Sequence, residues 1–139
     1  MGRFLVKTEP STYSWNDLVR DGGTVWDGVR NPEARNNLAA MAKGDLALVY
    51  HSGDDKAVVG IAEVTRAAFP DPKADDPKWL AVELAPVKPL PRAVTLAEIK
   101  AEARLAKIPL VTRGRLSVMA LDVKAFDAIV SLAKKKPAK

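Results

Sequence analysis

Frequent prolines and glycines divide this chain into short apolar segments, and that division limits its fold more than any other sequence feature. Ten prolines and eight glycines interrupt 139 residues, so only short strands and helices fit between them. Patterns typical of strands occur at 4–6, 24–26, 45–50, 57–66, 79–87 and 116–119. Helices are expected to follow the capping residues Ser14, Asn31, Thr95 and Asp122. This order predicts one α+β domain around a small, strongly curved sheet or barrel.

Proline, glycine and the apolar pattern also set expected ends for these elements. The first helix is expected to end near Arg20 with Val19 on its buried side, and the second to run from Pro32 to about Ala42. The strand at 79–87 alternates apolar and polar residues, and three prolines are expected to end it: Pro86, Pro89 and Pro91. Residues 70–78, with three prolines and three aspartates, are expected to form a solvated, mobile loop.

Composition excludes several classes of function. The chain has no cysteine and one histidine, so disulfides, thiolate nucleophiles, zinc ribbons and iron–sulfur sites are excluded, and no metal site is expected. The net charge of +5 includes four lysines within residues 134–139, so the remaining chain is nearly neutral. No apolar run reaches the ~18 residues of a membrane span. We expect a cytoplasmic monomer that does not bind membranes, nucleoid-associated in a bacterium or nuclear in a eukaryote.

Polar and aromatic side chains concentrate at the ends of the expected strands. Residues 25–32 combine an indole, a carboxylate, a guanidinium, a carboxamide and the start of a helix. Three further groups of this kind lie at 7–10, 50–52 and 115–118. We expect the four segments to meet around one small pocket.

The side chains in these segments suit the binding of a base. Trp26 offers a flat apolar face for stacking. Four residues have donors and acceptors for the edge of the base: Glu9, Asn31, His51 and Ser117. The helix start beside Arg30 and Arg35 is a candidate phosphate seat, and Lys7 can serve the same phosphate.

Each of these residues also has an ordinary structural explanation. A tryptophan such as Trp26 is more often a core residue than a stacking platform, and His51 is more often a structural histidine. Asn31 is adequately explained by its helix cap. Arg30 and Arg35 can be solvated or paired with Asp27 and Glu33, and Glu9 can form a surface pair with Lys7. A small hydrolase remains an alternative: it would use Glu9, or His51 and Ser52, although neighbouring strand residues point apart.

The order of motifs resembles the EVE domain family. The motifs are FLVKTEP at 4–10, YSWNDL at 13–18, WDGVRN at 26–31, YHS at 50–52 and RLSV at 115–118. The resemblance covers the whole chain except the lysine-rich end. It implies a PUA-like fold, a small curved β-barrel flanked by short helices, over residues 1–133, followed by a disordered tail at 134–139.

The resemblance also implies a function. EVE domains are regarded as readers of modified DNA bases, notably modified cytosines, held in an aromatic pocket after flipping. It therefore implies a non-enzymatic module that binds modified DNA without a cofactor, with an RNA-binding or RNA-modification accessory module as the alternative. By motif position, the resemblance assigns the phosphate contacts to Lys7, Arg30 and Arg35. It assigns the base-binding pocket to Lys7, Glu9, Tyr13, Trp26, Val29, Arg30, Asn31, His51, Ser52 and Ser117.

Overall fold

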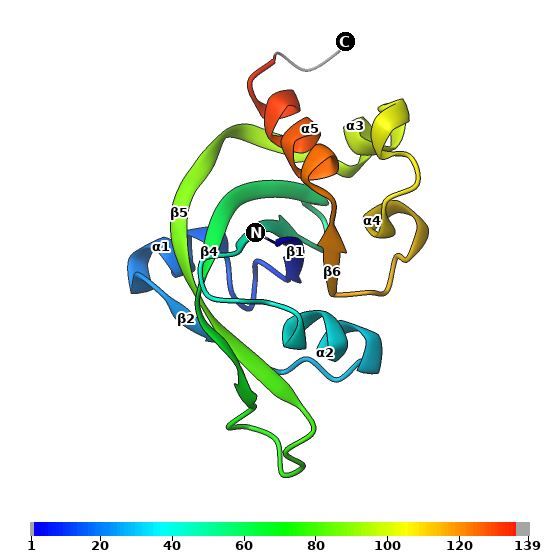
Figure 1. The fold of residues 1–139 in the computed structure, drawn as a ribbon. Coiled ribbons are helices and arrows are strands. Elements are labelled where there is room, and N and C mark those ends of the chain that lie inside the picture. The colour runs from blue at the N-terminus through cyan, green and yellow to red at the C-terminus, as the bar shows by residue number, and fades with distance from the viewer. Residues whose placement is uncertain (1, 136–139) are drawn as a thin grey trace.

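One curled sheet of six strands forms the centre of the molecule in the computed structural model, which describes residues 2–135 (Figure 1). The strands are β1 (Arg3–Thr8), β2 (Thr24–Trp26), β3 (Leu46–His51), β4 (Ala57–Pro70), β5 (Leu80–Thr95) and β6 (Val118–Leu121). The helices are α1 (Trp15–Asp21), α2 (Pro32–Ala39), α3 (Leu96–Ala101), the 3-10 helix η1 (Ala103–Leu105), α4 (Pro109–Thr112) and α5 (Val123–Ala133). None of these helices is both long and apolar enough to span a bilayer.

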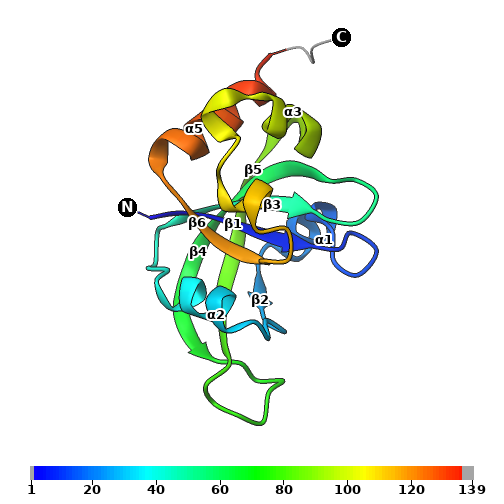
Figure 2. The ribbon, with the colours of Figure 1, turned by 90° about the vertical axis from the view of Figure 1, so that its right-hand side faces the viewer.

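The strand order in the sheet is β2-β5-β4-β3-β1-β6. β1 pairs in parallel with β3 and antiparallel with β6, and the other neighbours are antiparallel. The two longest strands, β4 and β5, curl around the centre, and the loop that joins them projects from one end of the molecule (Figures 1 and 2). Helices α3 and α5 lie at the opposite end in both views.

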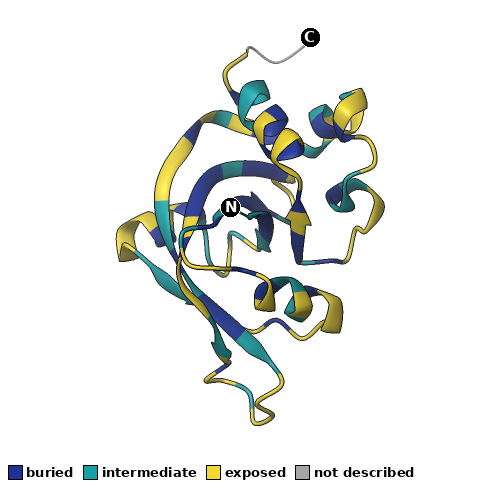
Figure 3. Ribbon diagram, viewed as in Figure 1, coloured by how far each residue is buried: buried dark blue, intermediate teal, exposed yellow. Residues whose placement is uncertain are grey.

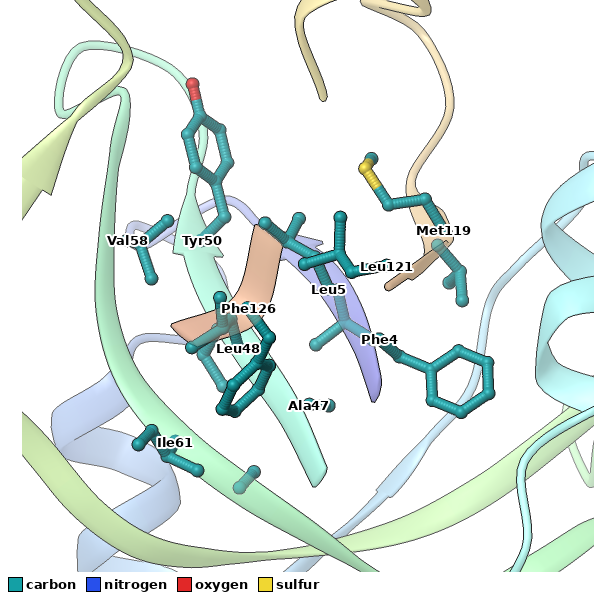
Figure 4. Packing of buried hydrophobic residues seen from close by; sticks show 14 of the residues in the cluster. Phe4, Leu5, Ala47, Leu48, Tyr50, Val58, Ile61, Met119, Leu121 and Phe126 are labelled. Atoms are coloured by element: carbon teal, nitrogen blue, oxygen red, sulfur yellow. The ribbon is translucent and has the colours of Figure 1, made fainter. Parts of the chain in front are cut away.

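The core fills the inside of this curl. The burial colours of Figure 3 follow the central strands and the inner faces of the helices. Leu5, Leu48 and Val58 are completely buried on β1, β3 and β4, and α5 adds Phe126 (Figure 4). Ile129, one turn further along α5, is also completely buried, so one side of this helix packs on the sheet.

Strand β5 runs through the prolines that were expected to end it. β2 covers the outer edge of β5 only from Val82 to Leu84, so later residues have a single neighbour, β4. A proline lacks an N–H, and an edge position tolerates that loss. The register also shifts around these positions, where Pro86 faces Ala62 and Pro89 faces Gly60. The prolines therefore shape a curved edge and do not stop the strand.

Two expected helix details were wrong. Helix α2 ends at Ala39, because the buried Asp45 carboxylate accepts the Ala42 N–H at 2.9 Å and turns the chain toward β3. Val19 is half exposed, whereas Trp15 and Leu18 face the core.

Helix α1 packs against the sheet through an indole over a glycine. A methyl group at Gly60 would lie 2.6 Å from carbons of the Trp15 ring. Contacts that short do not occur, so the bare backbone of β4 lets the ring approach closely. This packing fixes α1, and with it the segment that carries Tyr13.

Candidate functional site

One cavity, here called the main cavity, has a volume of about 570 Å³. It opens where the end of β1, the approach to α1, strand β2 and the β4–β5 loop meet. Its lining consists of Lys7, Thr8, Thr12, Tyr13, Thr24, Val25, Trp26, Asp27 and Lys73. Two of the four expected polar segments, 7–10 and 25–32, therefore contribute to one cavity.

Two aromatic rings form part of its wall. The centroids of the Tyr13 and Trp26 rings lie 6.4 Å apart and the planes meet at 86°, an edge-to-face pair. The Tyr13 hydroxyl donates to Asp21 Oδ2 at 2.9 Å, and burial raises the pKa of this phenol. Trp26 is only 8% exposed. It belongs to the core and to the cavity wall at once, so the two interpretations of this residue are compatible.

Lys7 joins the main cavity to a second one. Its ammonium donates to the Gly114 carbonyl at 2.9 Å and lies 5.8 Å from the Tyr50 ring centroid. Partial burial lowers the pKa of Lys7. The second cavity, of about 250 Å³, is lined by Lys7, Tyr50, Ser52, Gly53, Lys56, Leu96, Leu110 and Gly114. A third, also about 250 Å³, is lined by Asn31, Arg113, Gly114, Arg115 and Leu116.

Shared residues connect the three cavities, and their charge is mostly positive. Lys7 lines the first and second, and Gly114 lines the second and third. The charged side chains of the three linings are the acidic Asp27 and the basic Lys7, Lys56, Lys73, Arg113 and Arg115. The nearly neutral body thus gathers basic groups around three neighbouring cavities.

Several expected site residues have other partners in the structure. His51 Nε2 accepts the Trp15 N–H at 3.0 Å, and Nδ1 lies 3.1 Å from Asp55 Oδ2. Glu9 is exposed, and its carboxylate accepts from the Ser11 N–H and hydroxyl. The described chain contains no hydrogen bond from His51 to Ser52, and no group of three possible metal ligands.

Of the remaining expected residues, Asn31 lines the third cavity, whereas Ser117 and Val29 belong to none of the three linings. Asn31 caps α2 by accepting the Ala34 N–H at 3.0 Å while it lines the third cavity. The Ser117 carbonyl accepts the Lys7 N–H at 2.9 Å, which joins the strand end to the cavity. Val29 is buried, and its carbonyl accepts from Arg30 Nη1.

Asp71, which the sequence prediction missed, organises this region. Its side chain is completely buried in a loop that was expected to be solvated. Oδ2 accepts from the Gly28 N–H and from Arg30 Nη1, both at 2.8 Å, and Oδ1 accepts from the Lys73 N–H at 2.7 Å. Burial by itself raises the pKa of Asp71, but the hydrogen bonds from Arg30, Gly28 and Lys73 outweigh it and lower the pKa. Its position between two prolines was the available signal, since aspartate in such turns bonds nearby N–H groups.

Nearly the whole chain matches one protein family. Residues 3–132 match the EVE domain family, and the chain belongs to that family. It is 35% identical to human thymocyte nuclear protein 1, over 96% of this chain and 75% of the human protein.

Two solved structures are similar along nearly the full length. The structure of Rpa0253 from Rhodopseudomonas palustris is 41% identical with a TM-score of 0.92, covering 96% of this chain and 94% of that one. The human THYN1 protein in complex with 5-methylcytosine-containing DNA is 32% identical with a TM-score of 0.91, covering 99% of this chain and 100% of that one. The PUA-like α+β class expected from the sequence is confirmed.

Proposed function

We propose that this protein is a non-enzymatic module that binds nucleic acid and reads one flipped, modified base, with modified cytosine in DNA as the favoured ligand. The observation that carries the proposal is the main cavity, which has an aromatic wall and a basic rim within an EVE domain. The similarity to THYN1, whose structure contains 5-methylcytosine DNA, supports the choice of ligand.

In this proposal the main cavity receives the base. Trp26 and Tyr13 supply the aromatic surface, and Lys7 supplies a cation that is partly removed from water. Asn31 and Ser52 line the adjoining cavities, where the sugar and its neighbours fit. His51 acts by holding α1, since its ring binds the first N–H of that helix.

The phosphate contacts expected of Lys7, Arg30 and Arg35 form the second part of the proposal. Lys7 lies at the junction of two cavities. Arg30 and Arg35 flank the other side of the Trp26 segment, where Asp71 holds the Arg30 guanidinium. A polynucleotide can then be held on both sides of the flipped nucleotide.

The test compares matched duplexes that carry cytosine, 5-methylcytosine or 5-hydroxymethylcytosine at one position. Wild-type protein is expected to bind one modified duplex more tightly than the unmodified one, by about tenfold to a hundredfold. Trp26→Ala is expected to abolish this ratio and Trp26→Phe to keep most of it, because stacking needs an aromatic face. Equal affinity of the wild type for all duplexes would overturn the proposal.

Two further measurements separate the alternatives. The same titration with RNA carrying the same modified base decides between a DNA reader and an RNA-binding module. A substrate screen with His51→Ala as control addresses the hydrolase, and product formed by the wild type alone would contradict a non-enzymatic role.

A further inference from the structure

Three cations, two of them exposed and one partly buried, surround one indole beside the candidate site. The Arg30, Arg35 and Lys78 cations lie 5.8, 5.6 and 5.1 Å from the ring centroid of Trp79. We call these four residues the Trp79 cluster. They come from three segments: Arg30 precedes α2, Arg35 lies within α2, and the other two end the β4–β5 loop.

The cluster is held in place by the loop. The Asp71 N–H donates to the Trp79 carbonyl at 2.8 Å, which closes the base of the loop. The Asp71 carboxylate meanwhile holds Arg30 and the Gly28 N–H. One buried residue therefore fixes both the indole and one of the guanidinium groups above it. A cation held over an indole loses less conformational freedom when it binds a ligand.

Carboxylates neutralise the cluster only in part. Arg30 pairs with the buried Asp71, and Lys78 lies 3.7 Å from Asp76 at an exposed position. For Arg35, the described residues provide no carboxylate within 4.0 Å, and its polar contact is the Asn36 side-chain oxygen at 3.3 Å. The Arg30 side chain is still 42% exposed. The cluster thus presents positive charge to solvent on a prearranged surface.

Its location relates the cluster to the main cavity. Trp26, in the cavity wall, and Arg30 belong to one continuous segment, and Asp71 links that segment to the loop. The same loop places Lys73 in the cavity lining, where it lies 3.3 Å from Asp27. The cluster and the main cavity are therefore carried by the same loop and the same segment.

We propose that Trp79 and Lys78 join Arg30 and Arg35 into one phosphodiester-binding subsite for the strand that flanks the flipped nucleotide; this rests on the proposed function and deepens its phosphate contacts. Guanidinium groups match phosphate oxygens with two parallel donors, and arginine is the residue best suited to that contact. Such contacts position the nucleic acid and carry no base information. The cluster thus supplies affinity, and the main cavity supplies discrimination.

The experiment separates these two contributions. Arg35→Ala and Trp79→Leu are titrated with the methylated and unmethylated duplexes at several salt concentrations, beside Lys124→Ala, a cation on α5 at the opposite end of the molecule (Figure 1). Both cluster variants are expected to weaken binding of both duplexes about three- to tenfold and leave their ratio unchanged. The slope of log K against log salt is expected to become shallower by about 0.9 for each lost contact. Lys124→Ala is expected to match the wild type.

Outcomes that overturn the subsite are distinct from those that overturn the proposed reading of a modified base. Wild-type affinity and salt slope in both cluster variants would show that the subsite does not exist. A changed ratio of methylated to unmethylated affinity in Arg35→Ala would assign that residue to base reading instead. If the wild type shows no preference for the methylated duplex, the proposed reading of a modified base is wrong. A shallower salt slope in Arg35→Ala would still support the phosphate subsite in that case.

Discussion

At the scale of single residues, Asp71 is the most consequential side chain in the molecule. Its completely buried carboxylate accepts three hydrogen bonds and joins the β4–β5 loop to the segment before α2. Asp71→Asn keeps the shape but removes the charge that Arg30 needs. We expect this change to lower the free energy of unfolding at pH 7 by about 1–3 kcal/mol, measured by urea denaturation. Asp75→Asn, an exposed position in the same loop, is the matched control and should change little.

The same substitution has a defined pH dependence. The pKa of Asp71 is lower in the folded protein than its ordinary value of about 3.9 in an unfolded chain. The unfolded chain therefore binds more protons between these values, and the contribution of Asp71 is lost as pH falls through the folded pKa. The difference between wild type and Asp71→Asn should be full above pH ~4 and shrink below it. A difference that stays constant down to pH 2 would contradict this account.

The hydrogen-bond partners of side chains could be predicted from the sequence only where the partner is close along the chain. The caps at Ser14, Asn31, Thr95 and Asp122 are all confirmed by side-chain hydrogen bonds to the following N–H groups. Asp71 reaches Gly28, a residue 43 positions away, and no local pattern specifies that pairing. His51 likewise meets the Trp15 N–H 36 positions away.

At the scale of elements, Arg92 connects β5 to the end of α5. Its guanidinium donates to the Leu132 and Lys135 carbonyls at 2.9 and 2.6 Å and pairs through two nitrogens with Glu98, which belongs to the capping box of α3. We expect Arg92→Ala to lower the free energy of unfolding by about 1–3 kcal/mol, because helix-end carbonyls lose their donors and Glu98 loses its cation. Hydrogen exchange should quicken in the last turn of α5.

The control for this prediction is another arginine in an ion pair. Arg104 pairs with Glu102 at 3.0 Å, but it is 62% exposed. Arg104→Ala should cost no more than about 0.5 kcal/mol, as usual for surface pairs. Equal losses for the two variants would show that the carbonyl contacts of Arg92 contribute nothing.

Element positions were more predictable than element lengths. All six strands lie near their expected places, because the apolar patterns are local. The extension of β5 to Thr95 is possible because its later residues pair with β4 on one edge only. Which strands neighbour β5 is set by the strand order of the sheet, which the sequence pattern does not show. The early end of α2 depended on the buried carboxylate of Asp45.

At the scale of the whole molecule, charge distribution sets the salt dependence of binding. Lys7, Arg30, Arg35 and Lys78 are the proposed phosphate contacts, so log K against log salt should fall with a slope of about −3 to −4. The measurement uses a chain in which the four C-terminal lysines, at 134, 135, 136 and 139, are replaced by glutamine, which keeps the backbone. A slope steeper than about −6 in that chain would mean that the body contacts many more phosphates. The described structure ends at residue 135, so Lys136 and Lys139 lie outside it.

The candidate site itself could be predicted only in part. Of the four segments that were expected to meet around one pocket, 7–10 and 25–32 line the main cavity, whereas 50–52 and 115–118 line the two smaller ones. Lys73 and Thr24 also line the main cavity, and no motif distinguished them. Lys73 and Thr24 reach the cavity because the β4–β5 loop lies against the end of β2. That tertiary contact depends on the register of β5 against β2.

The position of β1 in the sheet has a consequence for how the protein is made. Among the described strands β1 is synthesised first, and it lies between β3 and β6, where its Arg3 pairs with Leu46 on one side and Leu121 on the other. Its antiparallel partner is thus synthesised more than a hundred residues later. During translation this edge of β1 therefore stays open until β6 has emerged from the ribosome. The sheet should accordingly close in a late step of folding.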